Sequence, residues 1–370
     1  MTRVAILNSR QSKTPVGNDP WVKATVSAVA HAAKSGWTIV SSYGLNTWEL
    51  VTWAAGRHSA NLLLVCPEDV TDEQKSEFMR RFDLLVDLVE WKPVPHGEQR
   101  SRTKDWWEGR DEAVTVLAEI LVPISIRKGG RLESVLQSRE TTSVDEQFRV
   151  RYSESSHHLR FDIIPDSANP ELRTWGSDWL IHWTRACNGP WPGETEAEYY
   201  AALANSGDQY CRSGFQTLSR ILQEKRIRAS SWRIGSGVPV VGLTELSPIE
   251  SVSLMRWRPR WSRWSIEPYG IAIHRDAALA LGLRPVQYVG NSEWDSLPES
   301  AKPYSHVRGK KADIWPAERE WRVAVDIDLT KLPAGQIRVV TLNHNERDAI
   351  ALACKYPVVS FSSGFGTAHK

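Results

Sequence analysis

The run NLLLVC at residues 61–66 decides the fold of the N-terminal part of this chain. Every position after Asn61 is apolar, and Pro67 follows the run at once. A strand covered on both faces loses the alternation of polar and apolar residues, and such strands are typical of parallel sheets with helices on both sides. We therefore expect residues 61–66 to form an inner strand of a parallel sheet.

The segments on both sides of this run alternate between strand and helix patterns. Strands are predicted at residues 3–7, 37–40 and 121–126, and helices at residues 22–33, 49–55, 71–90 and 110–119. Residues 92–104 are polar with two prolines, which indicates a loop. This alternation predicts a doubly wound, Rossmann-like α/β domain.

The chain has 370 residues, more than one hydrophobic core normally supports, so two domains are expected. Residues 132–145 are polar and rich in Ser, Glu and Thr, as in a linker or an extended surface arm. We place the boundary there, with domains 1–135 and 136–370. The second domain is predicted to be mixed α+β, with a helix at residues 215–224 and strands at residues 148–152, 158–164, 239–243, 269–273, 285–289 and 320–327.

Composition limits the class of protein. The net charge of +2 does not by itself indicate a nucleic-acid binder. The four cysteines show no CxxC pairing and no histidine at metal-ligand spacing, so we expect reduced thiols and no metal site. The N-terminus lacks the pattern of a signal peptide, and no apolar run approaches membrane-spanning length. We therefore expect a cytoplasmic protein without a membrane partner.

Arginine and tryptophan are interleaved at residues 256–264, which read RWRPRWSRW. Four arginines and three tryptophans without an acid offer phosphate contacts and stacking surfaces together. The alternative is a surface loop in which the rings anchor to the core and the arginines point outward. We predict nucleic-acid contacts through Arg256, Trp257, Arg258, Arg260, Trp261, Arg263 and Trp264.

Three other stretches hold candidate catalytic residues. In DWLIHWTR, residues 178–185, a strand would deliver His182 and Thr184 to a loop. The strand near residue 243 ends in Thr244 and Glu245 after a glycine-rich loop, which allows close approach to a ligand. A satisfied core or surface histidine and an ordinary strand end are the alternative interpretations.

The third stretch is WPAEREWRV, residues 315–323. In an extended segment Glu318, Glu320 and Arg322 would share one face. Two neighbouring acids can keep one carboxyl group protonated or stabilise an oxocarbenium-like centre. The alternative is that Glu and Arg only pair across strands.

The turns after the first two predicted strands are NSRQS at residues 8–12 and SSYGLNT at residues 41–47. At the carboxyl edge of a parallel sheet such turns present backbone N–H groups to phosphate, and Gly44 permits close approach. With EGRD at residues 108–111, the first third of the chain resembles the SLOG superfamily, which includes the DNA-processing protein A and lysine-decarboxylase-like Rossmann domains. The resemblance implies nucleotide binding at Gly44. A docking or DNA-binding module without a ligand is the alternative.

The order of motifs over about residues 178–330 resembles that of DarT-like ADP-ribosyltransferase-related domains. The resemblance implies that His182 and Thr184 hold the ribose of NAD and that Tyr269 stacks on the nicotinamide. It also implies that Glu320, or alternatively Glu318, polarises the attacking group. The implied cofactor is NAD, and the implied target is a nucleobase or nucleotide in DNA, which must leave the base stack to react.

Two other functions remain open. The first is an NAD-independent enzyme that hydrates the nitrile of a 7-cyano-7-deazaguanine base in DNA to the amide. Cys187 or Cys211 would then be the nucleophile, with Glu245 or Glu320 as its acid/base partner. The second is a non-catalytic nucleotide sensor in phage defence, with protein partners of a DNA-modification or defence system.

Overall fold

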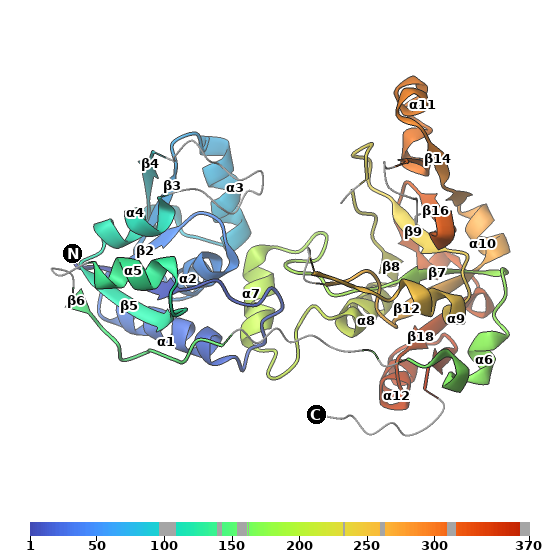
Figure 1. The fold of residues 1–370 in the computed structure, drawn as a ribbon, viewed down its shortest axis with the longest axis horizontal. Coiled ribbons are helices and arrows are strands. Elements are labelled where there is room, and N and C mark those ends of the chain that lie inside the picture. The colour runs from blue at the N-terminus through green and yellow to red at the C-terminus, as the bar shows by residue number, and fades with distance from the viewer. Residues whose placement is uncertain are drawn as a thin grey trace. The chain divides into compact units, whose positions relative to one another are not determined.

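The structure is a computed structural model that describes residues 1–95, 109–138, 143–153, 161, 163–231, 234–259, 263–308 and 316–362. It divides into two compact units, which can be followed by colour in Figure 1. Unit 1 comprises Met1–His157 and Asn188–Cys211, and unit 2 comprises His158–Cys187 and Arg212–Lys370. This division differs from the boundary expected between residues 135 and 136.

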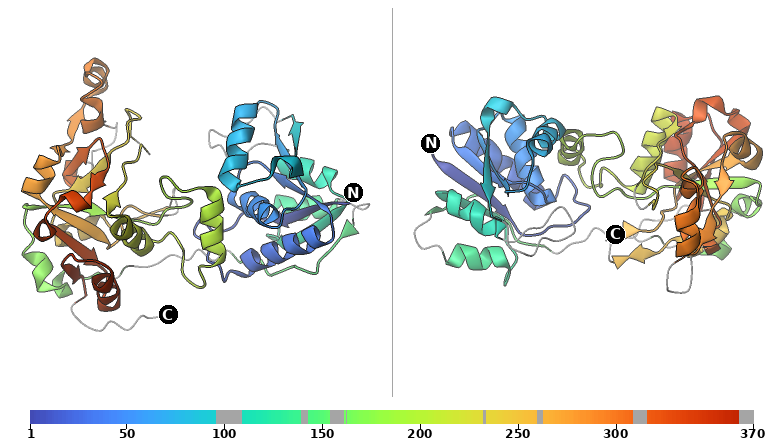
Figure 2. Two further views of the ribbon diagram at one scale, coloured as in Figure 1. Left: turned by 180° about the vertical axis from the view of Figure 1, so that it is seen from behind. Right: turned by 90° about the horizontal axis from the view of Figure 1, so that it is seen from above.

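Unit 1 is built on a six-stranded parallel sheet with the order β4-β3-β2-β1-β5-β6. Helices α1 and α2 pack together on one face, and α4 and α5 pack together on the other, as the views in Figure 2 show. The strands are β1 (Arg3–Asn8), β2 (Thr38–Ser42), β3 (Leu62–Pro67), β4 (Val89–Val94), β5 (Ile120–Ser125) and β6 (Ser143–Val144). The helices are α1 (Pro20–Lys34), α2 (Asn46–Arg57), α3 (Asp72–Phe82), α4 (Arg110–Leu117) and α5 (Arg131–Gln137).

The doubly wound fold predicted for the N-terminal part is confirmed, and all six residues of β3 are buried as its apolar sequence indicates. Three local predictions are wrong. The helix expected at residues 71–90 ends at Phe82, where Asp83 has a left-handed backbone, and β4 begins at Val89. The segment expected to be a loop from residue 92 begins inside β4, an edge strand whose free side tolerates Pro93. The expected linker at residues 132–145 contains most of α5 and all of β6, because Leu132 packs into the core beneath its polar neighbours.

The segment Asn188–Cys211 belongs to unit 1 although it follows β7 of unit 2 in the chain. Its helix α7 (Glu196–Ala204) packs on α2 and α3. The buried Tyr200 hydroxyl donates a hydrogen bond to Glu49 Oε2 at 2.8 Å, and Glu196 forms an ion pair with Arg81. These contacts join sequence-distant segments, so no local pattern predicts them.

Unit 2 contains a seven-stranded sheet with the order β13-β16-β9-β7-β12-β18-β19. All neighbours are antiparallel except β18 and β19, so the predicted mixed α+β architecture is confirmed. The strands are β7 (Trp179–Trp183), β9 (Val241–Thr244), β12 (Gly270–His274), β13 (Arg284–Pro285), β16 (Glu320–Val323), β18 (Ile337–Thr341) and β19 (Val358–Ser360). The helices are α6 (Pro170–Arg173), α8 (Gly214–Glu224), α9 (Pro248–Ser251), α10 (Arg275–Ala280), α11 (Asn291–Ser296) and α12 (His344–Ala353).

Three predicted strands of this part differ from the structure. Residues 285–289 are divided between β13 and β14 (Gln287–Val289), which lie in different sheets. Residues 320–327 are divided between β16 and β17 (Ile327–Asp328), which pairs with β8 (Arg226–Ile227). Residues 148–152 form no strand, and most of residues 158–164 lie outside the described part of the chain.

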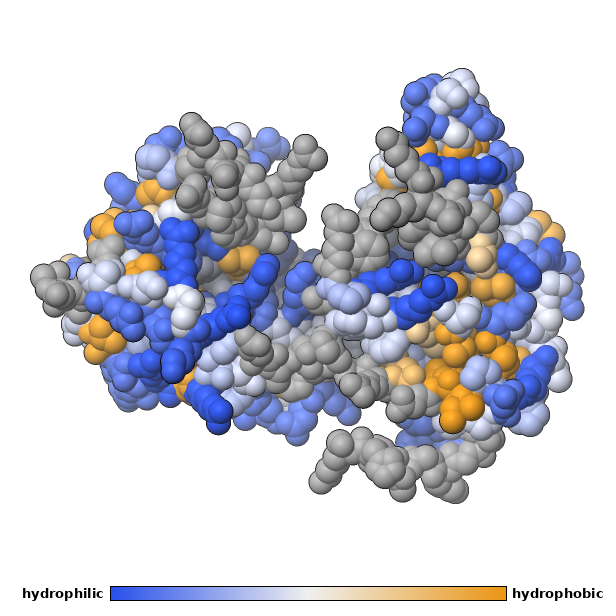
Figure 3. Space-filling model, viewed as in Figure 1, coloured by the Kyte–Doolittle hydropathy of each residue, from blue (hydrophilic) through white to orange (hydrophobic). Residues whose placement is uncertain are grey.

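Each face of the unit 2 sheet carries its own hydrophobic cluster. One contains Leu180, Ile271 and Leu243, and the other contains Ile181 and Ala272 together with three tryptophans, namely Trp175, Trp179 and Trp183. Figure 3 shows a largely hydrophilic face on which hydrophobic side chains gather near the α6 and α9 of Figure 1. Several of the eighteen tryptophans therefore serve packing.

Within the described ranges, no helix combines the length and apolarity needed to cross a bilayer.

Candidate functional site

His182 lies near the end of β7, where its half-buried ring reaches the neighbouring strand β9. The Nδ1 atom is 2.8 Å from the carbonyl oxygen of Gly242. A carbonyl only accepts, so Nδ1 carries the proton and Nε2 of the neutral ring is left as an acceptor. Loss of hydration lowers the pKa of His182 and the charge of Arg185 adds to this, while the bond to Gly242 opposes it. The ring is therefore neutral at pH 7 and offers Nε2 to a hydroxyl donor.

Glu320 approaches the same glycine from β16. A Cβ placed on Gly242 would lie 3.1 Å from Glu320 Oε1. Both carboxylate oxygens accept from the buried Arg322, with Nε to Oε1 at 2.8 Å and Nη2 to Oε2 at 2.9 Å. Such a two-point, charge-assisted pair fixes the plane of the carboxylate. Gly242 thus contacts both residues, but the register places Glu320 on the face of Ile181 and His182 on the opposite face with Ile271.

If Glu320 takes part in a reaction, replacing Gly242 with alanine should lower the rate by about tenfold while the fold is kept, because the new methyl group displaces the carboxylate of Glu320. The measurement is the rate of product formation together with the thermal unfolding curve. Gly335→Ala is the matched control, since a Cβ at that glycine meets nothing within 4 Å. An unchanged rate in Gly242→Ala would show that the placement of Glu320 does not matter.

Glu318 precedes β16 in a short 3-10 turn (Pro316–Glu318) and not in an extended segment. Arg319 has a left-handed backbone, with φ of 43°, so the chain bends between the two acids. The prediction that Glu318 shares one strand face with Glu320 and Arg322 is therefore wrong. The turn is held by Thr244, whose hydroxyl donates to the backbone oxygen of Glu318 at 2.5 Å.

The environment of Glu318 favours its protonated form. Burial raises the pKa of the carboxyl group and the charge of Glu320 adds to this, so that its net value is about 7. Arg258, Arg256 and Arg185 act in the opposite direction. At pH 7 roughly half of the Glu318 side chains thus carry a proton, which is the state required of a group that both gives and takes protons. The structure therefore groups the two acids with arginines of the predicted nucleic-acid motif.

That motif forms a hairpin in which β10 (Trp257–Arg258) pairs with β11 (Arg263–Trp264). Trp257 lies opposite Trp264, and Arg258 lies opposite Arg263. Residues directly opposite one another share a face, so the tryptophans occupy one face and the arginines the other. The Trp264 ring contacts Trp257 and Phe161 edge-on. The rings thus pack as anchors, and the arginine face is the one that acts on Glu318. Arg260 and Trp261 lie outside the described residues.

Thr184 and Tyr269, predicted to contact NAD, are both buried. The Thr184 hydroxyl is 2.8 Å from the carbonyl oxygen of Gly214, and the Tyr269 hydroxyl donates to Glu346 at 2.9 Å. The ring of Tyr269 also belongs to the hydrophobic core. An NAD-binding role would require both residues to leave these positions. His182 is the one of the three that presents an open polar atom, so the set as placed does not fit NAD.

Of the residues predicted for nitrile hydration, the two cysteines are close along the backbone, because the N–H of Cys187 donates to the carbonyl oxygen of Arg212, next to Cys211, at 2.9 Å. Glu245, at the end of β9, forms an ion pair with Arg275 and accepts a hydrogen bond from Trp321 Nε1 at 3.1 Å. Cys187 belongs to unit 2 and Cys211 to unit 1, and both are half-buried. In the part of the chain that the structure describes, no three His, Cys, Asp or Glu side chains are grouped to hold a metal ion.

Glu267 is a functional candidate that the sequence analysis missed. It is 2% exposed and accepts hydrogen bonds from the backbone N–H of Ala186 at 2.6 Å and of Gly214 at 2.9 Å. Burial raises its pKa to about 7 against these two bonds. It thereby links the loop after His182 to the start of α8. Its signal in the sequence is a single acid in the apolar stretch SIEPYGIAI at residues 265–273.

In unit 1 the predicted glycine turn lies at the carboxyl edge of the sheet. Gly44 and Leu45 both have positive φ, 78° and 73°, and lead into α2, which lacks a side-chain cap. At the end of β1 and in the loop that follows it, the buried Asn8 Oδ1 and Gln11 Nε2 have no hydrogen-bond partner within the described residues. Ligand binding at Gly44 stays a prediction. It is favoured by these two buried polar atoms, because a ligand could supply their missing hydrogen-bond partners.

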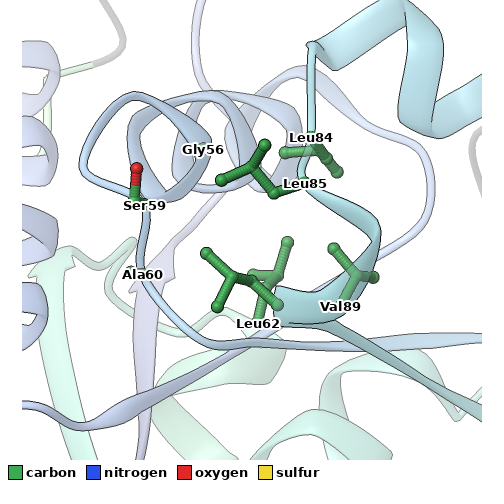
Figure 4. A pocket seen from close by; sticks show the side chains of 8 residues that line it. Gly56, Ser59, Ala60, Leu62, Leu84, Leu85 and Val89 are labelled. Carbon is green, nitrogen blue, oxygen red and sulfur yellow. The ribbon is translucent and has the colours of Figure 1, made fainter.

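The pocket in Figure 4 lies at the other edge of the unit 1 sheet, beside the start of β3 and of β4. Its lining is apolar apart from one hydroxyl and consists of Gly56, Ser59, Ala60, Leu62, Leu84, Leu85, Leu88 and Val89. A small apolar space at the amino ends of the strands is not where α/β sheets bind ligands. It offers no chemistry for the functions considered above.

No protein-family model matches the chain, and no curated protein matches it. Two solved structures of the molybdenum cofactor carrier protein of Chlamydomonas reinhardtii are similar to part of it, each with 13% identity and a TM-score of 0.25. The similarity covers 39% of this chain and 73% or 74% of the carrier protein. At this level it does not bear on function.

Proposed function

We propose that unit 2 is an enzyme that modifies a nucleotide or a nucleobase in DNA and that its reaction is centred on Glu318 and Glu320. The main support for this proposal is that these two acids, separated in the chain by one residue, have different surroundings. Glu320 is held by Arg322, whereas Glu318 is desolvated and has a pKa of about 7. Unlike environments for two neighbouring carboxyl groups are typical of divided acid/base roles.

Each residue has a distinct role in this proposal. Glu318 gives a proton to a leaving group, or takes one from an attacking hydroxyl, because its pKa matches neutral pH. Glu320 provides fixed negative charge for a developing positive centre. His182 is not given a role in this reaction, because its side chain lies on the face of the sheet opposite Glu320. None of these roles requires the residue to change its contacts.

The arginines near Glu318 support an anionic substrate. Arg258, Arg256 and Arg185 all act on Glu318, while the nearest second acid, Glu320, is already paired with Arg322. The excess of positive charge favours the phosphates of a nucleotide or of DNA. A base would have to leave the duplex to reach these half-buried acids. The ADP-ribosyltransferase-like scaffold remains part of the proposal, but no step is assigned to NAD, because Thr184 and Tyr269 do not fit it as placed.

The test is to incubate the protein with single-stranded DNA, duplex DNA and DNA carrying 7-cyano-7-deazaguanine, each with and without NAD. Digested nucleosides and small molecules are then analysed by mass spectrometry. A new nucleoside mass is the expected result. Release of nicotinamide with an ADP-ribose adduct would establish transfer from NAD, and gain of one water on the nitrile without NAD would establish hydration.

Variants separate the two chemistries. Hydration by a thiol nucleophile should be lost in Cys187→Ser or in Cys211→Ser, whereas transfer from NAD should survive both changes. If none of the mixtures shows a new mass, the catalytic proposal is wrong. The polar carboxyl edge of unit 1, with Asn8 and Gln11, would then be the place to test for a nucleotide sensor.

A further inference from the structure

Arg258 is an arginine with unused hydrogen-bonding capacity. Its Nε is buried without a hydrogen-bond partner among the described residues. A guanidinium presents donors in a fixed fork, and leaving a buried donor unpaired costs about 1–3 kcal/mol. Arg258 therefore has a donor available for an acceptor from a ligand.

Glu318 is an acid whose carboxyl group lacks a hydrogen-bond partner among the described residues. Within the described ranges its carboxyl group makes no hydrogen bond and no ion pair, yet Arg258 and Arg256 are near enough to lower its pKa. Arg256 is exposed and uses only Nε in a side-chain hydrogen bond, to the Ser253 carbonyl at 2.6 Å. Arg185 also lowers the pKa of Glu318, and its Nη1 donates to the carbonyl oxygen of Ser265 at 3.2 Å. The buried Nε of Arg258 therefore remains a donor for an anionic ligand beside Glu318.

Resting on the proposed function, we infer that Arg258, Arg256 and Arg185 form a phosphate-binding subsite and that, when a phosphate binds there, Glu318 takes up a proton from the solvent. The ligand class is a phosphate oxyanion, supplied by a nucleotide or by the backbone of DNA. Arginine suits this ligand because its planar fork matches phosphate oxygens. The subsite uses no residue of the tryptophan face of the hairpin.

The protonation follows from the charges around Glu318. At present the three arginines favour its carboxylate, and the neighbouring Glu320, itself paired with Arg322, disfavours it. An anion on the arginines cancels their attraction and adds a second negative charge, so both effects favour the acid form. The protonated carboxyl group can donate its O–H to a phosphate oxygen, or to a leaving group beside it. Substrate binding would thus convert Glu318 into the general acid.

The test is titration calorimetry with oligothymidylate that lacks terminal phosphates, because its charge is constant near neutral pH. Affinity should fall by about tenfold between about pH 6 and pH 8, as expected when one proton with a pKa near 7 must be taken up. Repeating the titration in buffers of different ionisation enthalpy counts the protons. Uptake of nearly one proton is expected at about pH 8 and nearly none at about pH 6. Thymidine 5′-monophosphate in a second series distinguishes a nucleotide phosphate from a backbone phosphate.

Variants identify the groups involved. Glu318→Gln should bind with the affinity seen at low pH and without pH dependence, and Arg258→Gln should bind at least about tenfold more weakly at each pH. Arg347→Gln, on the surface of α12 beside Asp348, is the matched control and should bind normally. Binding by the unmodified protein without pH dependence would overturn the inference, as would unchanged binding by Arg258→Gln. No turnover is measured, so failure of the proposed reaction would not be mistaken for failure of this subsite.

Discussion

Replacing Glu318 with glutamine should lower product formation at pH 7 by at least about a hundredfold, the typical contribution of a positioned general acid or base. Glutamine has nearly the same shape but cannot exchange a proton. The Thr244 bond to the backbone of residue 318 does not depend on the side chain and is kept. The measurement is the initial rate in the mass-spectrometric assay, with circular dichroism to show that the fold is retained.

The pH profile gives a sharper form of this prediction. If Glu318 acts as an acid, the rate should fall as pH rises through about 7, because the raised pKa means that the proton is lost there. If it acts as a base, the rate should rise over the same range. Either limb should be absent in Glu318→Gln. Glu293→Gln, an exposed acid on α11, is the control and should keep the unmodified profile. A variant with normal rate and profile would exclude Glu318 from the chemistry.

Ionisation of Glu267 should destabilise unit 2 by roughly 2–3 kcal/mol between about pH 5 and pH 9. Its pKa in the folded protein is about 7, above the ordinary value of 4.5. Below pH 4.5 the group is protonated in both states and has no effect. Between 4.5 and 7 the unfolded chain releases the proton first, so stability falls as pH rises, and above 7 the full penalty applies.

The measurement is the difference in free energy of unfolding between the unmodified protein and Glu267→Gln, followed by urea denaturation across this pH range. The difference should change in favour of the variant as pH rises. Glutamine leaves one of the two backbone donors, at Ala186 or Gly214, without its acceptor, which adds a penalty that does not vary with pH. The pKa of His182 is lowered from 6.5, so its ionisation changes stability only below about that pH, and it does so equally in both proteins. Parallel curves would show that Glu267 keeps its charge throughout.

The sequence by itself determined the architecture of unit 1. Burial on both faces of a sheet demands local apolar runs, and the one at residues 61–66 became the fully buried β3. It also determined that two acids stand together near residue 320, because neighbours in the chain remain neighbours in space. The interleaving of arginine and tryptophan at residues 256–264 was equally visible, whereas their separation onto opposite faces depends on the hairpin register, which the structure decided.

Only the tertiary structure decided which distant residues meet these local features. Nothing in the chain near Glu318 indicates that Arg258, sixty residues earlier, acts on it, or that Glu320 lies against Gly242. The insertion of Asn188–Cys211 into unit 1 has the same character. Local patterns record burial and backbone preference, whereas a shifted pKa depends on desolvation and on charges brought close by folding. The acid/base character proposed for Glu318 is therefore a property of the assembled sheet and its arginine hairpin.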